Sequence, residues 1–179
     1  MADLTPSPVG KDVARVDAYD KVTGAARFAD DLQFGPGLYY GRLVRSPHAH
    51  ALIREMNVSQ AEKVPGVKAV VTGRDVTSRI GLYLIDRPIF ADDRVRYVGD
   101  PVAGVVATSE QAAVEAARLV EVVYEELPAV FDPVGAAQPD APLLHPDLGE
   151  YEVANFIFPE PGTNVSEHFK LRRGDVESA

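Results

Sequence analysis

The sequence predicts an α+β fold in which a mixed, mostly antiparallel sheet packs against two main helices. Three observations support this prediction. Short apolar runs recur between turn residues, two Ser/Thr-x-x-Glu/Gln motifs mark helix starts, and the order strand–helix–strand occurs twice. The strands come in closely spaced pairs, which favours antiparallel pairing through short connections.

The N-terminal residues carry turn signals and little hydrophobic periodicity. Residues 1–10 contain two prolines before any pattern begins, which predicts a flexible lead-in. Residues 11–31 are polar and broken, and we expect a turn over residues 20–24. The run Phe34-Gly-Pro-Gly37 predicts a second turn ahead of the first strand.

Two strands are predicted next, over residues 38–45 and 49–56. The first run is aromatic and β-branched, and Ser46-Pro47 ends it. The second run is also typical of a strand.

A short helix is predicted between Ser59 and Pro65. Ser59 stands three residues before Glu62, which is the spacing of a capping box, and a Pro-Gly pair ends the helix. Residues 67–72 alternate weakly and predict a strand, whereas residues 73–93 show no regular pattern.

Residues 95–107 predict two strands around the turn Gly99-Asp100-Pro101. The second of these strands is almost wholly apolar, which predicts burial on both faces. The chain ahead of residue 112 then contains a second capping box, Thr108-Ser-Glu-Gln111.

This second capping box opens the best helix in the chain. The expected apolar face carries, at spacings of i, i+4, i+7 and i+11, the residues Ala112, Ala116, Leu119 and Val123. A period of two takes over near Val120, so we expect a strand that ends before Pro128.

The character of the sequence changes after Phe131. Six of the fourteen prolines fall within residues 133–161, which predicts an extended segment. Residues 168–171 predict a strand, and Gly174-Asp175 predicts a turn followed by a helix N-cap. We therefore expect the sequence to end inside an element, as a fragment or a split subunit would.

Composition narrows the class of protein. With 18 basic and 27 acidic residues the formal net charge is −9, which disfavours nucleic-acid and membrane partners. No apolar run approaches the length of a bilayer span, and no secretory signal is visible, so we expect a cytoplasmic protein. The absence of cysteine excludes disulfides, thiolate zinc sites and Cys-ligated iron–sulfur clusters on these residues.

Two histidines invite a metal-site interpretation. His48 and His50 are two residues apart, so on a strand they would share a face and could begin a metal site. No third ligand is near them in sequence, and His145 and His168 lie in the Pro-rich tail. We favour the alternative, in which both imidazoles bind backbone groups or water.

Other motifs give little support for catalysis. Carboxylates occur as neighbours at residues 30–31, 92–93 and 125–126, but neighbours on a strand point apart and aspartates at turns bind their own backbone. The glycines around residues 35–41 lack the spacing of a dinucleotide loop and precede a strand. Arg172-Arg173 suits a solvated pair or a salt bridge to a partner.

We predict no catalytic, cofactor-binding or metal-binding residue on this chain. The loop Gly99-Asp100-Pro101 is the one segment that could contribute to a larger site. Its glycine allows an unusual φ, and its proline fixes the chain ahead of a buried strand. A required tight turn is the main interpretation, and an inter-domain contact is the alternative.

Several stretches together resemble a known family. They are, in order, DKVTGAARFADD (20–31), GLYYGRLVRSPHAHA (37–51), VPGVKAVVTGRDV (64–76), VRYVGDPVAGVVA (95–107) and AVEAARLVEVVYEELP (113–128). Their order and spacing are similar to the start of the molybdenum-binding large subunits of xanthine dehydrogenases, aldehyde oxidases and carbon monoxide dehydrogenases. The resemblance implies an N-terminal α/β-hammerhead domain.

The resemblance also implies a functional context. Such enzymes hydroxylate an activated C–H bond with water as the oxygen source, or oxidise carbon monoxide, and use a molybdenum held by a pterin, two [2Fe–2S] clusters and usually FAD. The family's catalytic glutamate and pterin-binding loops match no position here. The implied partners are a molybdopterin-binding domain, an Fe–S subunit and possibly an FAD subunit, and the isolated chain is expected to be inactive.

We therefore divide the chain into three parts: a flexible lead-in (1–10), an α/β-hammerhead domain (11–137) and an extended Pro-rich arm (138–179) that leads to an absent molybdopterin-binding domain. The expected role is a structural and assembly module of a molybdenum hydroxylase oxidoreductase. The alternative is a stand-alone hammerhead scaffold or binding protein with no redox role.

Overall fold

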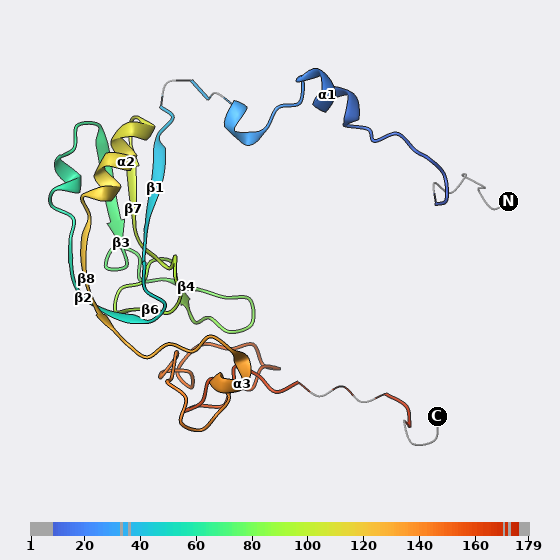
Figure 1. The fold of residues 1–179 in the computed structure, drawn as a ribbon, viewed down its shortest axis with the longest axis vertical. Coiled ribbons are helices and arrows are strands. Elements are labelled where there is room, and N and C mark those ends of the chain that lie inside the picture. Colours follow the sequence, from blue (N-terminus) through green and yellow to red (C-terminus); the bar gives the residue numbers. More distant parts are fainter. Residues whose placement is uncertain (1–8, 33, 36, 170, 172, 176–179) are drawn as a thin grey trace. The chain divides into compact units, whose positions relative to one another are not determined.

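The computed structural model describes residues 9–32, 34–35, 37–169, 171 and 173–175. It divides into two compact units, one that ends at Leu38 and one that begins at Tyr39 (Figure 1). The predictions for residues 1–8, 172 and 176–179 lie outside the described residues, as do Pro36 of the predicted turn and Lys170 of the predicted strand.

The N-terminal unit contains a short helix where a turn was expected. Helix α1 spans Ala18–Thr23, and Gly24 ends it in the left-handed region at φ 74°. The predicted turn over residues 20–24 is therefore wrong, because its glycine serves as the C-terminal cap of a helix instead. Neither α1 nor the 3₁₀ helix η1 (Ala29–Asp31) buries a residue.

The second unit is built on a three-stranded antiparallel sheet in the order β1–β7–β3. Its strands are β1 (Tyr40–Arg45), β7 (Pro101–Ala107) and β3 (Val67–Thr72). The central strand β7 is buried along most of its length, which confirms the burial predicted from its apolar sequence.

A second three-stranded antiparallel sheet has the order β6–β2–β8. Its strands are β6 (Arg94–Val95), β2 (Ala51–Asn57) and β8 (Glu121–Glu126). In the predicted irregular middle of the chain, β4 (Arg79–Ile80) and β5 (Arg87–Pro88) form a further antiparallel pair. The mostly antiparallel α+β class is confirmed, with the strands divided among these sheets.

Helix α2 (Glu110–Arg118) follows β7 directly. Its N-cap is Ser109, whose hydroxyl accepts a hydrogen bond from the Ala112 amide at 3.2 Å, so the predicted cap at Thr108 is wrong by one residue. Ala112, Ala113 and Ala116 are buried, whereas Leu119 is 39% exposed, because the helix ends before the predicted stripe does.

The other predicted capping box does not form. The chain near Ser59 makes only the 3₁₀ helix η2 (Ala61–Lys63), and its N-cap is Gln60 without a side-chain hydrogen bond. Only a few residues separate Ser59 from the Pro-Gly pair at 65–66, which is too short for an α-helix to propagate.

Two groups of buried apolar residues fill the interior. One lies between η2, α2 and the sheet β1–β7–β3 and includes Val105 and Ala116. The other surrounds Val95 and Val102. Val44, Met56 and Val122 pack against both groups, so the two sheets share one continuous interior.

The Pro-rich segment folds back where an extended course was predicted. It starts with the short helix α3 (Pro133–Ala136), which Asp132 caps, and it buries Leu148 and Ile157. Backbone hydrogen bonds join it to the segment before β5, at Ile85 N to Glu152 O and Ala154 N to Tyr83 O. The described residues of 168–171 form no strand, and the three-part division stays a prediction.

Candidate functional site

The predicted loop Gly99-Asp100-Pro101 is fastened to the end of β1. The Gly99 amide donates to the Ser46 carbonyl at 2.8 Å, and the Ser46 amide donates to the Asp100 carbonyl at 2.9 Å. Gly99 has a φ of 92°, which explains why glycine stands there. The Arg45 guanidinium also donates to the Gly99 carbonyl. The tight-turn interpretation therefore has a structural basis, and the inter-domain role stays a prediction.

Asp100 is a buried carboxyl group, with 7% of its surface exposed. Its Oδ2 atom accepts a hydrogen bond from the Arg96 amide at 3.0 Å. Burial raises the pKa of Asp100, against the opposing effects of that amide and of the nearby Arg96 and Arg87 charges. The carboxyl group thus belongs to the turn and also borders a cleft.

This cleft has a volume of about 360 Å³ and lies between the β5 segment, the loop before β7 and the Pro-rich segment. The residues that line it are Asp86, Arg87, Pro88, Arg96, Tyr97, Asp100 and His145. Arg96 joins the loop before β7 to the Pro-rich segment, because its Nε atom donates to the Leu144 carbonyl, 48 residues away in sequence. We call this hollow the Arg87–Arg96 cleft.

His145 brings an imidazole to the cleft. Its Nδ1 atom lies 3.2 Å from the Tyr151 hydroxyl, and its Nε2 atom lies 3.8 Å from a carboxylate oxygen of Asp86. Burial lowers the pKa of His145, and the positive charge of Arg96 lowers it further. Sequence reasoning assigned no role to Arg87, Arg96 or His145; the only signal was the recurrence of arginine through residues 79–96.

The two histidines tested as metal ligands have separate partners. The Nδ1 atom of His50 donates to the Pro128 carbonyl at 2.7 Å, since a carbonyl can only accept. His48 instead contacts Glu126 at 3.1 Å, and its ring is tilted against the Tyr124 ring with the centroids 4.8 Å apart. Within the described part of the chain, no group of three or more His, Asp or Glu residues could hold a metal ion.

The carboxylates that are neighbours in sequence bind separate partners. Glu125 pairs with Arg54 while its neighbour Glu126 contacts His48. The Asp92 side chain accepts from the Asp93 amide, and the Asp31 side chain accepts from the Phe28 amide. None of these pairs forms two facing carboxylates. Gly41 lies within β1, in a strand and not in a phosphate-binding loop.

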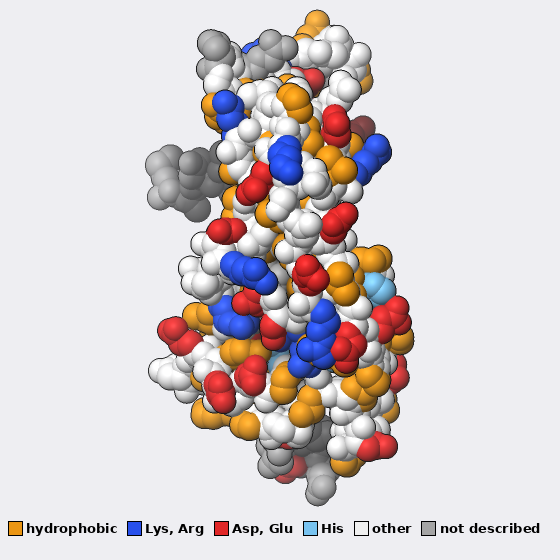
Figure 2. Space-filling model, turned by 90° about the vertical axis from the view of Figure 1, so that its left-hand side faces the viewer, with side chains coloured by type: hydrophobic (Ala, Val, Ile, Leu, Met, Phe, Trp, Pro, Cys, Tyr) orange, Lys and Arg blue, Asp and Glu red, His pale blue; other side chains and the backbone are white. Residues whose placement is uncertain are grey.

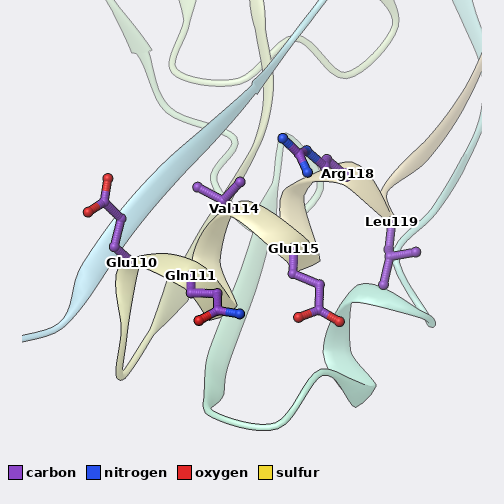
Figure 3. A pocket seen from close by; sticks show the side chains of 6 residues that line it. All are labelled: Glu110, Gln111, Val114, Glu115, Arg118 and Leu119. Carbon is purple, nitrogen blue, oxygen red and sulfur yellow. The ribbon is translucent and has the colours of Figure 1, made fainter.

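A larger but shallow hollow lies along α2 (Figure 3). Its lining is the outer face of this one helix: Glu110, Gln111, Val114, Glu115, Arg118 and Leu119. Figure 3 shows these side chains pointing in different directions. They do not converge on a common point, so the hollow carries no argument for a binding site. On the face drawn in Figure 2, acidic and basic side chains intermingle with hydrophobic ones.

The fold and the sequence both match one family. A family model described as "Aldehyde oxidase and xanthine dehydrogenase, a/b hammerhead domain" matches residues 23–128. The chain belongs to this family. The α/β-hammerhead fold class that the sequence predicted is thereby confirmed, and so is the resemblance on which that prediction rested.

Individual members show how much of a hammerhead-containing protein this chain spans. It is 44% identical over 135 residues to a probable xanthine dehydrogenase subunit of Bacillus subtilis (strain 168), and the match covers 74% of this chain and 18% of that protein. A solved CO dehydrogenase from Oligotropha carboxidovorans superimposes with a TM-score of 0.68 at 38% identity, covering 77% of this chain and 18% of the other.

The aldehyde oxidoreductase from Desulfovibrio gigas gives a TM-score of 0.67 at 36% identity, over 74% of this chain and 16% of that one. The chain thus spans about a fifth of the length of these relatives. Among the described residues, no helix is long and apolar enough to cross a membrane.

Proposed function

We propose that this chain is a structural and assembly module of a cytoplasmic molybdenum hydroxylase oxidoreductase of the xanthine dehydrogenase, aldehyde oxidase or carbon monoxide dehydrogenase type. The observation that carries the proposal is the hammerhead match over residues 23–128 in a chain that spans about a fifth of its relatives. Its partners would be a molybdopterin-binding domain, an Fe–S subunit and possibly an FAD subunit.

The absence of cysteine supports placing the iron–sulfur clusters on other domains or subunits. No cysteine is present for an iron–sulfur cluster, and the described residues bring together no set of three His, Asp or Glu ligands. The residues therefore do not fit a Cys-ligated iron–sulfur cluster, and we derive no catalytic step for them. In this proposal the molybdenum-pterin, the [2Fe–2S] clusters and FAD belong to other domains or subunits.

Activity assays of the purified chain test whether the chain is catalytically inactive by itself. The chain is assayed with xanthine, an aldehyde and carbon monoxide in the presence of a dye acceptor, and its molybdenum content is measured by mass spectrometry. We expect no turnover and no stoichiometric molybdenum. Dye reduction together with bound molybdenum would contradict the proposal.

Co-expression tests the assembly role. The chain is produced with the molybdopterin-binding and Fe–S polypeptides encoded in the same genome, and complexes are separated by size exclusion. We expect the chain to elute with at least one of them. Separate elution from both would favour the alternative of a stand-alone scaffold.

A further inference from the structure

Two arginines line the Arg87–Arg96 cleft and two more lie near it. Arg79 lies on β4, Arg87 on β5 and Arg94 on β6, and Arg96 follows two residues later. Arg87 and Arg96 line the cleft itself. Arg79 and Arg94 lie close enough for their charges to act on His145. The short strands thus bring four guanidinium groups to one region of a chain whose net charge is −9.

The guanidinium groups that line the cleft are held by neutral acceptors. Arg87 donates to the Tyr97 hydroxyl at 3.0 Å and lies over the Tyr97 ring. Arg96 donates to the carbonyls of Leu144 and Arg94. These contacts fix the orientation of each guanidinium without an ion pair to a carboxylate.

The two flanking arginines follow the same pattern. Arg79 donates to the Asp86 carbonyl and lies over the Tyr151 ring. Arg94 approaches His50 Nε2 at 3.5 Å, while its own Nε atom is buried without a partner. Among the ion pairs of the described residues, carboxylates pair with Arg15 and Arg54, and with none of these four arginines.

Two carboxylates line the cleft, and neither forms an ion pair with Arg87 or Arg96. Asp100 is turned toward the backbone amide of Arg96 inside its own loop. Asp86 lies nearest to His145, at 3.8 Å. Arg87 and Arg96 therefore keep N–H donors that no carboxylate among the residues described occupies, which favours an anion in the cleft.

The geometry narrows the class of anion. A guanidinium has five N–H donors in a planar fork, and Arg87 and Arg96 use only some of theirs. Such forks bind carboxylate and phosphate through paired hydrogen bonds. A volume of about 360 Å³ suits a small molecule.

We propose that the Arg87–Arg96 cleft binds the oxyanionic group, a phosphate or a carboxylate, of a small molecule. Arg87 and Arg96 supply the charge-assisted hydrogen bonds, and the Tyr97 hydroxyl orients Arg87. The inference is independent of the proposed assembly role, because it rests only on side chains of this chain.

NMR titrations of the full chain test the proposal. The ¹⁵N-labelled protein is titrated separately with sodium phosphate and sodium succinate at constant ionic strength, with sodium chloride as the reference. We expect saturable shifts of the Arg87 Nε–H group and of the Tyr97 and Gly99 amides. Saturation by phosphate alone assigns a phosphoryl ligand, and saturation by succinate alone assigns a carboxylate. Saturation by both assigns the shared oxyanion chemistry, and absence of saturable shifts with either anion overturns the proposal.

Matched variants assign the binding to the cleft. Arg87→Gln should weaken anion binding by about tenfold, the effect of losing one charge-assisted pair. Arg118→Gln makes the same change in net charge on α2, outside the cleft, and should leave binding unchanged. If Arg87→Gln lowers the Tm, Tyr97→Phe serves as the second variant and should weaken binding by a smaller factor. Equal affinity in the wild type and in both cleft variants overturns the proposal.

Discussion

At the scale of single residues, Asp100 combines a buried carboxyl group with a backbone partner. Its Oδ2 atom satisfies the Arg96 amide, and its own carbonyl receives the Ser46 amide. A buried polar group is tolerated only when it is hydrogen-bonded, so this aspartate stabilises the turn through its acceptor atom and not through its charge.

Asp100→Asn and Asp100→Ala separate these two effects. Asparagine keeps an oxygen for the Arg96 amide and removes the cost of a buried charge, so its free energy of unfolding at neutral pH should lie within about 1 kcal/mol of wild type. Alanine leaves the amide without its partner and should cost about 1–3 kcal/mol. Urea unfolding measures both values. An asparagine variant as unstable as the alanine variant would show that the charge itself is required.

The lowered pKa of His145 predicts how the stability of the protein depends on pH. Its folded-state pKa is lowered, chiefly by burial, so below the ordinary histidine pKa of about 6.5 the unfolded chain binds this proton more readily than the folded chain. The contribution of His145 to stability is therefore present above that pH and is lost as the pH falls below it. Asp100, whose pKa is raised by burial, contributes in the opposite direction.

Urea unfolding between about pH 5 and 7.5 checks this sign. The wild type should lose more stability on acidification through this range than the variant His145→Gln, which cannot titrate there. The other three histidines remain in both proteins, so the difference isolates His145. Identical slopes would show that the folded protein accepts the proton on this imidazole without cost.

Sequence reasoning could find Gly99-Asp100-Pro101 but not the cleft beside it. A Gly-Asp-Pro turn ahead of an apolar strand is a local pattern, and local patterns can be read directly. Arg96 and Leu144 meet across 48 residues, and Arg45 and Gly99 across 54. Such neighbours depend on how segments distant in sequence pack together, which local patterns do not reveal.

At the scale of elements, the same substitution in the two capping motifs should change the free energy of unfolding by different amounts. The Ser109 hydroxyl accepts from the Ala112 amide at the start of α2. Ser109→Ala should therefore lower the free energy of unfolding by about 0.5–2 kcal/mol. Ser59 caps no helix, so Ser59→Ala should change it by less than about 0.5 kcal/mol. Thermal and urea unfolding of both variants measure the difference, and equal costs would show that α2 does not depend on its cap.

Two strands with a local pattern of apolar residues were predicted well. The strand expected over residues 67–72 is β3, and the apolar strand in the second half is β7. The two-residue strands β4 and β5 are too short to show a period of two. Helix α1 lies in a polar segment and buries no residue, so it has no apolar stripe from which it could be predicted.

At the scale of the whole molecule, the order of elements predicts the fold class but not the division into sheets. Strand β7 lies between β1 and β3 in one sheet, and β2 lies between β6 and β8 in the other. Each sheet therefore combines strands from both halves of the chain. Long-range contacts decide whether the strands form one sheet or two. Local sequence patterns do not show the entropic cost of closing the loops between such contacts.

The Pro-rich segment departs from its predicted extended course for an identifiable reason. Proline content favours extended conformations, but Leu148 and Ile157 are apolar and become buried, and the Asn164 side chain binds three backbone groups. Its amide donates to the carbonyls of Ala136 and Pro142, and its oxygen accepts from the Leu144 amide. Tertiary contacts thus outweigh the local preference.

Asn164 also connects this segment to the Arg87–Arg96 cleft, because Leu144 receives Arg96 on its carbonyl while its amide is held by Asn164. Asn164→Ala removes all three side-chain hydrogen bonds and leaves part-buried backbone groups unpaired, which should destabilise the segment by about 1–3 kcal/mol. Hydrogen exchange should show faster exchange of the Leu144 amide, with the β7 amides unchanged. Asn155→Ala, at an exposed position in the same segment, is the matched control and should leave exchange unaltered. Unchanged exchange at Leu144 in the Asn164 variant would mean that the apolar contacts of Leu148 and Ile157 hold the segment without this asparagine.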